Sequence, residues 1–147
     1  MTALDPDVVG EVEASCVCLH VQRAGRTVGR HYDKAFRPLN LTNWQFSLLA
    51  AVGGADGPSV NELALLLGMD RTTMTRNLRV LERRGLLTMR PDDQDGRIRR
   101  ALLTPEGRDL FLKALERWRT VNETMKARIT PASLPSVWDA FERIAQP

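Results

Sequence analysis

The chain of 147 residues is poor in the residue types that most enzymes and metalloproteins use for their chemistry. It contains two histidines and two cysteines, and it has no glycine-rich phosphate-binding fingerprint. Neither a nucleophile–base pair nor a metal-ligand cluster can be recognised in it. We therefore expect a protein that is not an enzyme and that holds no metal and no cofactor.

Long hydrophobic runs and a secretory leader are also missing. No apolar stretch approaches the roughly 20 residues that span a bilayer, and the segment after Met1 does not resemble a signal sequence. These absences predict a cytoplasmic protein with no membrane partner. The length suits one good core and is too short for two ordinary domains, which predicts a single domain over residues 1–147.

What the sequence does contain, near its middle, is a helix, a tight turn and a second helix. Ser59 is the expected cap of the first helix, and Glu62, three residues on, completes a capping box. Thr42 and Gln45 predict another capping box, for a helix that precedes this pair. Gly68 permits the sharp turn. Asp70 is the expected cap of the second helix, which runs to residue 84 and stops at Gly85.

The second helix has an apolar side and a polar side. At about 100° per residue, its large apolar residues share one side, and most of its threonines and arginines lie opposite. A helix that enters the major groove needs short polar side chains near its N-terminus for base edges and cations further along for phosphates. The alternative for any single arginine is a solvated surface position. The residues of this helix that we expect to contact DNA are Arg71, Thr72, Thr73, Thr75, Arg76 and Arg79.

Positive charge is concentrated in the same part of the chain. Residues 70–100 hold nine arginines against five acidic residues, a balance of +4, whereas the whole chain carries +3. A positive field confined to one part of a protein favours attraction of phosphates. Double-stranded DNA is therefore the expected partner.

A charged hairpin follows the second helix. Residues 86–90 and 98–103 predict two short strands joined by an acidic loop. We expect Asp95 to align the side chain of Arg97 through a charge-assisted pair, so that the guanidinium points into the narrow minor groove. Arg99 is expected to contact DNA as well. A turn that touches nothing is the alternative.

Several segments in combination resemble one known family. They are Leu41-Thr42 with Gln45, Glu62-Leu63-Ala64, Met69-Asp70, Thr75-Arg76, the run from Leu81 to Leu86, the wing from Asp92 to Arg97, and Leu103-Thr104-Pro105-Glu106-Gly107. Over about residues 12–130 the chain is similar to the multiple antibiotic resistance regulator (MarR) family. The resemblance implies a homodimeric, mostly helical transcription regulator, whose affinity for DNA is switched by a small ligand or by oxidation.

The predicted fold is mostly α with a small β-hairpin wing. Residues 41–103 form a winged helix-turn-helix lobe that binds DNA, and residues 7–36 and 105–145 form a helical dimerisation region. The helix 105–128 would span about 36 Å, more than so small a domain can cover with itself, so we expect its apolar stripe to need a partner. Packing within a monomer is the alternative.

A two-fold dimer would place two recognition helices about one DNA turn, roughly 34 Å, apart. We therefore expect a repressor that binds pseudo-palindromic operators as a homodimer. By the family resemblance, an apolar, often aromatic and anionic ligand would bind between the dimer helices and the lobe and release the DNA. An architectural DNA-binding protein without a ligand response is an alternative. The residues that we expect to contact the ligand are His20, Arg23, Trp44 and Phe46.

Oxidation of a cysteine is the other possible signal. In the resemblance, Cys18 occupies the position of the reactive cysteine of the organic-hydroperoxide-sensing subgroup, and Tyr32 matches a tyrosine that contacts the thiolate from the partner subunit. Gln22 and Asn43 stand where that subgroup has two further tyrosines, which reduces the stabilisation of a thiolate.

A metal site near these cysteines is not expected. Cys16 and Cys18, two apart on one predicted helix, point about 200° away from each other and can form no disulfide while that helix persists. Cys16 and His20 share a helix face, but His31 lies eleven residues beyond, about 16 Å along the axis. No third ligand is therefore close.

Overall fold

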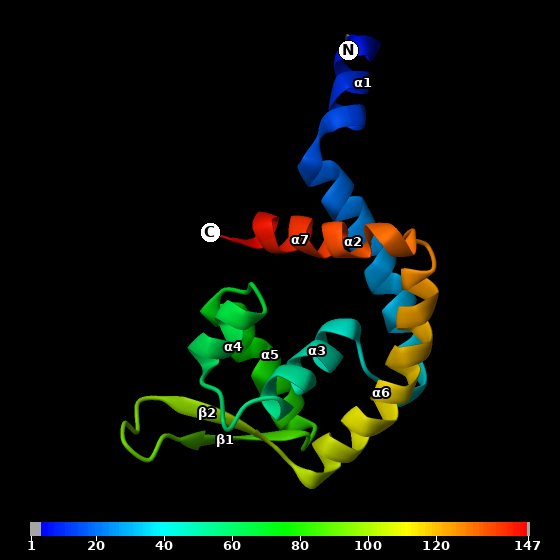
Figure 1. Ribbon diagram of the computed structural model, residues 1–147. Helices are drawn as coiled ribbons and strands as arrows, with labels where there is room; N and C mark the ends of the chain where they lie inside the picture. Colours follow the sequence, from blue (N-terminus) through cyan, green and yellow to red (C-terminus); the bar gives the residue numbers. More distant parts are fainter. Residues whose placement is uncertain (1–3, 147) are drawn as a thin grey trace.

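The computed structural model describes residues 4–146 and shows a mostly helical protein with one antiparallel hairpin, as predicted (Figure 1). In the part of the chain that the structure describes, none of the helices has the length and the apolar composition that a bilayer span requires. The elements in chain order are α1 (Pro6–Ser15), α2 (Val17–Phe36), the 3-10 turn η1 (Arg37–Leu39), α3 (Asn43–Gly53), α4 (Val60–Leu66), α5 (Arg71–Arg83), β1 (Leu87–Pro91), β2 (Arg99–Leu103), α6 (Pro105–Lys126), η2 (Pro131–Ser133) and α7 (Leu134–Ala145).

The elements are arranged as a stem with a lobe at one end. Helices α2 and α6 pack against each other and form the stem, and α3, α4, α5 and the hairpin gather beside its lower end (Figure 1). Helix α1 extends beyond the upper end of the stem, and α7 turns away from the end of α6 to project sideways. In the hairpin, Leu87 pairs with Leu103 and Pro91 with Arg99.

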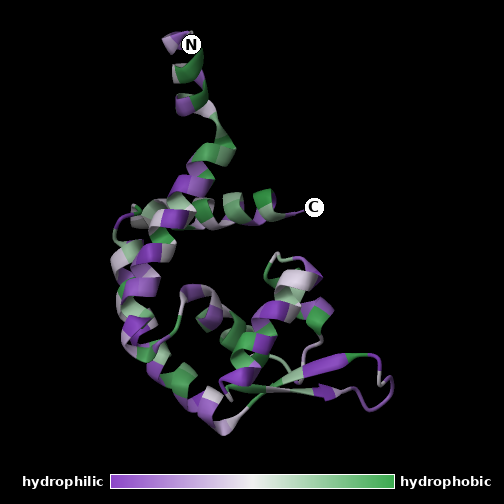
Figure 2. Ribbon diagram, turned by 180° about the vertical axis from the view of Figure 1, so that it is seen from behind, coloured by the Kyte–Doolittle hydropathy of each residue, from purple (hydrophilic) through white to green (hydrophobic). Residues whose placement is uncertain are grey.

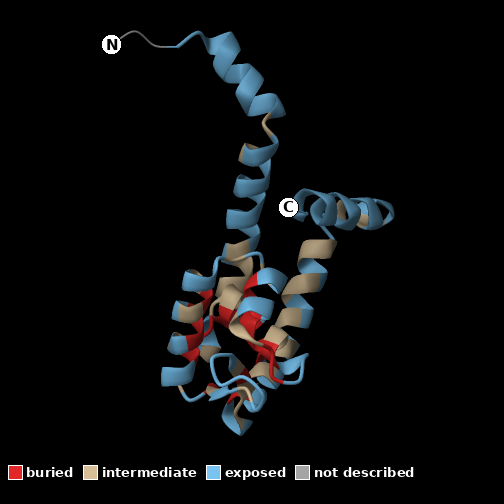
Figure 3. Ribbon diagram, turned by 90° about the vertical axis from the view of Figure 1, so that its left-hand side faces the viewer, coloured by how far each residue is buried: buried red, intermediate tan, exposed pale blue. Residues whose placement is uncertain are grey.

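The buried residues belong to the lobe and to the parts of the stem that touch it (Figure 3). Phe36, at the end of α2, and Ala114, on α6, are the stem residues that contribute fully buried side chains to this core. None of the described residues of α1 or α7 is buried. The upper stem and its two flanking helices therefore have no core of their own within one chain.

The helix starts of the lobe follow the predicted caps. The hydroxyl of Thr42 accepts the backbone N–H of Gln45, and the Gln45 side chain accepts the Thr42 N–H in return. Ser59 and Glu62 make the same reciprocal pair at the start of α4. Because each box satisfies amides that the first helical turn leaves free, these boundaries are set by residues only three apart in sequence.

Helix α6 begins so close to the segment between α5 and β1 that a side chain at Gly107 cannot be accommodated. A Cβ atom there would lie 1.8 Å from the carbonyl oxygen of Leu86. Thr104 holds the two segments together, because its hydroxyl donates to the Gly85 carbonyl at 2.6 Å and accepts the Gly107 N–H at 3.0 Å. Backbone packs directly on backbone at this contact.

The predicted helix over residues 7–36 is in fact two helices. Cys16 has an extended backbone, with ψ of 106°, and so ends α1 and caps α2. Its sulfur accepts the Leu19 N–H at 3.5 Å, and the Ser15 hydroxyl bonds back to the Glu11 carbonyl at 2.7 Å. Serine and cysteine are weaker helix formers than alanine or leucine, and both side chains here compete for backbone groups. Contrary to the prediction, Cys16 and Cys18 therefore do not lie on one continuous helix.

The apolar stripe of α6 is also covered differently from the prediction. Phe111, Leu115 and Trp118 pack against the core of their own chain, so intramolecular packing explains this half of the stripe. Val121 and Met125, further along, are half-buried. The large apolar side chains that remain exposed on the stem and its flanking helices are on α1, α2 and α7, with Leu112 of α6.

We predict that Gly107→Ala destabilises the fold by roughly 2–4 kcal/mol, because the methyl group overlaps the Leu86 carbonyl and backbone must move to admit it. Urea unfolding followed by circular dichroism measures the change. Gly10→Ala is the matched control, since nothing lies within 4 Å of the position that its Cβ would take. Equal stability of the two variants would show that the contact between α6 and the segment before β1 is not tight.

Candidate nucleic-acid interface

Helix α5 is fixed on the lobe by its apolar side and by caps at both ends. Met74, Leu78 and Leu81 are buried, with 2% or less of each side chain exposed. Asp70 caps the first turn and accepts the Thr73 N–H at 2.8 Å and the Thr73 hydroxyl at 2.6 Å. These bonds hold the pKa of Asp70 below its usual value. Gly85, with φ of 70°, ends the helix as predicted.

The opposite side of α5 is polar and faces solvent. A hollow of about 450 Å³ runs along it and is lined only by arginines and threonines. All but one of the α5 residues predicted to contact DNA lie here, together with Arg83. The exception is Thr73, whose hydroxyl and N–H are both bound to Asp70. The lining residues are Arg71, Thr72, Thr75, Arg76, Arg79 and Arg83.

A second, larger hollow separates α5 from the hairpin. It measures about 570 Å³, and arginines stand on both of its walls. Arg71 and Arg79 come from α5, and Arg97 and Arg99 come from the hairpin. Arg99 also donates to the Met89 carbonyl across the hairpin at 2.8 Å. The structure thus brings residues 71, 79, 97 and 99 to one groove. In Figure 2 the ribbon of the outer part of the hairpin is coloured mostly hydrophilic.

The wing tip is organised differently from the prediction. The carboxylate of Asp95 accepts the backbone N–H of Arg97 at 3.0 Å, and no ion pair joins it to the Arg97 guanidinium within the described residues. Two backbone bonds close the turn, from the Asp92 N–H to the Ile98 carbonyl and from the Ile98 N–H to the Asp95 carbonyl, both 2.9 Å. Asp95 therefore positions Arg97 through its backbone and leaves the exposed side chain free to turn.

The strongest polar contacts of the wing involve Asp92 and Arg100, which sequence reasoning missed. One carboxylate oxygen of Asp92 accepts the N–H groups of Gln94 and Asp95, both at 2.9 Å, and the other binds the guanidinium of Arg100. Arg100 also donates to the Gly57 carbonyl at 2.8 Å. An aspartate directly after a proline is a usual sequence signal for a turn in which the carboxylate accepts the backbone N–H two residues on. Nothing in the local sequence identifies the arginine that binds this carboxylate.

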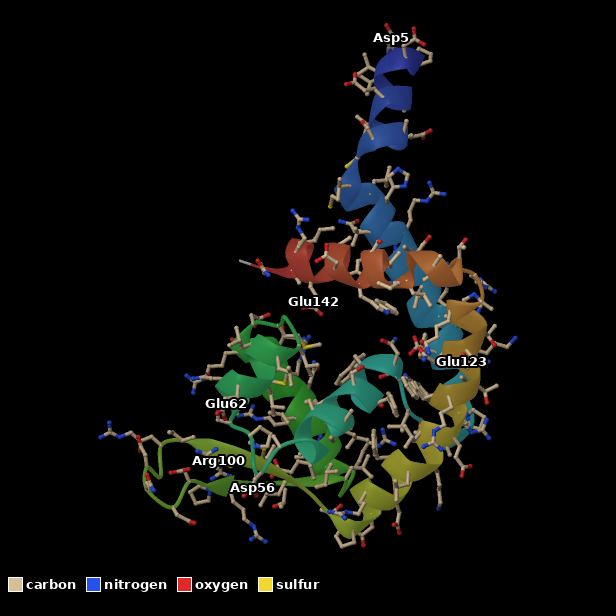
Figure 4. All side chains as sticks on the ribbon, viewed as in Figure 1. Asp5, Asp56, Glu62, Arg100, Glu123 and Glu142 are labelled. Atoms are coloured by element: carbon tan, nitrogen blue, oxygen red, sulfur yellow. The ribbon has the colours of Figure 1, made fainter. Side chains whose placement is uncertain are left out.

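These bonds, with that from Arg100 the largest cause, lower the pKa of Asp92 from 3.8 to about 2. The carboxylate is favoured in the folded state, so its stabilising effect is complete above about pH 4 and is lost as the pH falls through about 2. The pair is therefore intact across the whole physiological range. Figure 4 shows Arg100 lying between Glu62 and Asp56, so this arginine is surrounded by acidic groups of its own chain.

The residues predicted to bind an effector are not gathered together. Phe46 lies at the centre of an aromatic cluster, with its ring 4.7 Å from Phe36, 5.2 Å from Phe111 and 6.4 Å from Trp118 between centroids. It lines two hollows, of about 390 and 270 Å³. The other three predicted ligand contacts line neither hollow. Trp44 packs on the core, and His20 and Arg23 are exposed on α2.

The predicted redox pair is separated within one chain. Cys18 is exposed and accepts the Gln22 side-chain amide at 3.1 Å. Tyr32 lies 14 residues further along α2, about 21 Å along its axis, and its hydroxyl donates to Asn122 of α6 at 2.8 Å. Burial raises the pKa of Tyr32, against a smaller opposing effect of Lys126. In residues 4–146, no three histidine, cysteine or acidic side chains lie close enough together to hold a metal ion.

Comparison with known sequences points to DNA-binding regulators. The sequence profile described as the MarR family matches residues 39–98. The uncharacterized HTH-type transcriptional regulator YybA of Bacillus subtilis is 30% identical over 76 residues, which are 52% of this chain and 51% of YybA. The HTH-type transcriptional regulator Hpr of Halalkalibacterium halodurans is 31% identical over 94 residues, 64% of this chain and 49% of Hpr. The chain spans about half the length of these curated relatives.

Comparison with solved structures extends the similarity to almost the whole chain. The transcriptional regulator MosR of M. tuberculosis in complex with DNA is 36% identical, with a TM-score of 0.78, and the match covers 88% of this chain and 96% of MosR. The repressor CouR of Rhodococcus jostii, bound to a 23-mer DNA duplex, is 24% identical with a TM-score of 0.84 over 99% of this chain and 100% of CouR. A mutant MarR from E. coli with operator DNA is 19% identical, with a TM-score of 0.83 over 90% of this chain and 96% of that one. The last two similarities show the fold alone.

Proposed function

Because the chain belongs to the MarR family of DNA-binding transcription regulators, we propose that it is a repressor that binds a pseudo-palindromic operator as a homodimer and is released by a small aromatic or anionic ligand. The relatives reported above are transcription regulators, which is a non-enzymatic function. The observation that carries the proposal is the groove with arginines on both walls, between α5 and the wing.

The proposed DNA contacts follow from the two faces of α5. Its 13 residues extend about 20 Å, enough to lie along the major groove, and its buried side leaves no freedom to rotate. In this proposal Thr72 and Arg76 face base edges in the major groove of DNA. Arg71 and Arg79, which line the groove between α5 and the wing, bind phosphates of one DNA strand. Arg97, on the exposed wing tip, reaches the adjacent minor groove.

We predict that Arg97→Ala weakens DNA binding by about 1 kcal/mol or more and lowers the slope of log affinity against log salt by about one unit.

Arg76→Ala should relax sequence preference more than it lowers nonspecific affinity, because a bidentate contact to a base is lost. Sequences selected from random duplexes, followed by titrations at several salt concentrations, provide both measurements. Arg119→Ala, an exposed arginine of α6, is the control. Unchanged affinity and slope for Arg97→Ala would remove the wing from the mechanism.

The proposed homodimer is supported by the surface that one chain leaves uncovered. The chain exposes 10695 Å², whereas a compact monomer of 16.5 kDa exposes about 7,500 Å². Much of the uncovered apolar surface is on the helices assigned to the dimerisation region, residues 7–36 and 105–145. The exposed large side chains there include Val8, Val12, Val17, Val21, Val28, Trp138, Phe141 and Ile144.

We predict that the chain is a dimer at micromolar concentration and that Trp138→Glu combined with Phe141→Glu raises its dissociation constant by about a hundredfold or more, because two aromatic side chains lose their cover. Analytical ultracentrifugation measures this constant. Leu65→Glu is the control, since Leu65 is 84% exposed but lies on α4 in the lobe. A monomeric wild-type protein at micromolar concentration would contradict the proposal.

The proposed ligand site is the pair of hollows that share Phe46 and Trp118 in their linings. The larger is lined almost wholly by apolar side chains, which suits an aromatic ring, and the smaller includes Gly25 and Gly29 of α2 and Asn43 of α3. Because α2 belongs to the stem and α3 to the lobe, an occupant would act between the two parts. Ser47 lines both hollows and is itself exposed.

We predict that at least one compound from a panel of benzoic and hydroxycinnamic acids raises the melting temperature and weakens DNA binding about tenfold or more. Ser47→Phe should remove this response by filling the hollows, while Ser47→Ala should keep it.

Thiol oxidation at Cys18, an exposed residue whose sulfur accepts the Gln22 side-chain amide, is the second candidate signal. Loss of DNA binding in peroxide, restored by thiol and absent in Cys18→Ser, would favour it over the ligand.

A further inference from the structure

Arg100 differs from Arg99, whose guanidinium donates to one backbone carbonyl, because its own guanidinium binds a carboxylate as well as a carbonyl. It binds the Asp92 carboxylate and the Gly57 carbonyl, and it lies 3.8 Å from the Glu62 carboxylate. Its side chain is 36% exposed, and that of Asp92 is 13% exposed. A guanidinium that is already bonded to oxygens on two sides is poorly placed to bind a phosphate.

The contact with Asp92 reaches the wing tip directly. Asp92 gathers the N–H groups of Gln94 and Asp95 on one oxygen, and Asp95 in turn holds the N–H of Arg97. The ion pair with Arg100 occupies the other oxygen of Asp92. The loop that carries Arg97 is thus organised by one carboxylate, whose own orientation is set by Arg100.

The remaining contacts of Arg100 reach the segment before α4. The Gly57 carbonyl belongs to the loop between α3 and α4, and Glu62 belongs to the capping box that starts α4. The backbone adds to this connection, because Ser59 and Arg100 form an isolated antiparallel β-bridge. Next to it, the Ala101 N–H donates to the Pro58 carbonyl at 2.9 Å. Helix α4 packs on α5, so Arg100 links the wing tip to the support of the recognition helix.

We propose that Arg100 is a positioning residue for DNA recognition, which fixes the wing tip at a set place relative to α5 and so brings Arg97 to the minor groove without contacting DNA itself. The inference rests on the proposed contact of Arg97 with DNA. This role of Arg100 predicts that a change of charge at Asp92 acts on DNA binding in the direction opposite to simple electrostatics. Removal of the negative charge of Asp92 should weaken DNA binding, although loss of an acidic group near phosphates would otherwise strengthen it.

The test is a double-mutant cycle on DNA affinity and its salt dependence, with wild type, Arg97→Ala, Arg100→Gln and the double variant. We expect Arg97→Ala and Arg100→Gln each to weaken binding about fivefold or more. Each should lower the salt slope by about one unit, and the double variant should be within about twofold of Arg97→Ala alone. Arg100→Lys should behave like Arg100→Gln, because an ammonium keeps the charge but cannot bind Asp92 and Gly57 together.

Asp92→Asn is the second variant, and Asp93→Asn, at an exposed neighbouring aspartate, is its control. We expect Asp92→Asn to weaken binding and Asp93→Asn to leave it unchanged or stronger. Carboxyl NMR should show the pKa of Asp92 rising from about 2 toward 3.8 in Arg100→Gln. Melting temperatures of all variants separate a local change of the wing from unfolding of the lobe.

The outcomes distinguish this inference from the proposed function. If Arg97→Ala binds as well as wild type, the wing contact itself fails, and the inference fails with it. If Arg97→Ala weakens binding but Arg100→Gln and Asp92→Asn do not, only the role of Arg100 is wrong. If the losses of Arg97→Ala and Arg100→Gln add, or if Arg100→Lys retains full affinity, Arg100 acts as an independent phosphate contact, which also overturns the inference.

Discussion

The burial of one side of α5 in the lobe is the constraint on which the rest of the structure depends. Met74, Leu78 and Leu81 are inserted into the same core as residues of α3, α4 and the hairpin, so the helix can neither rotate nor slide. The opposite side is thereby committed to solvent. Because that side holds four arginines and two threonines, the packing that stabilises the lobe also presents its cationic surface.

Features set by residues close in sequence could be predicted, and features set by distant residues could not. The capping boxes of Thr42 and Ser59 join residues three apart, so the pattern alone located the starts of α3 and α4. The pairing of Asp92 with Arg100 spans the hairpin, and that of Arg100 with Gly57 joins residues 43 apart. Their partners follow only from the fold.

The stem shows the same difference between local and distant information. Helical spacing predicted the apolar stripe of α6, but it could not show that Phe111 and Trp118 are covered by Phe46 of the same chain. In the candidate site, sequence pattern located the arginines of α5 and the wing, whereas Thr73 and Asp95 have backbone roles that only the geometry reveals. The break at Cys16 depends on a sulfur cap that propensity does not anticipate.

The separation of α1 from α2 has a consequence for the unassembled chain. A helix of 10 residues with no buried side chain is below the length of about 12–15 residues at which isolated helices become stable in water. In the proposed homodimer, the partner subunit would supply the cover that helix α1 lacks within one chain. Its helical content, and its resistance to proteases near Cys16, would then depend on protein concentration, so that the amino-terminal segment reports assembly while the lobe does not.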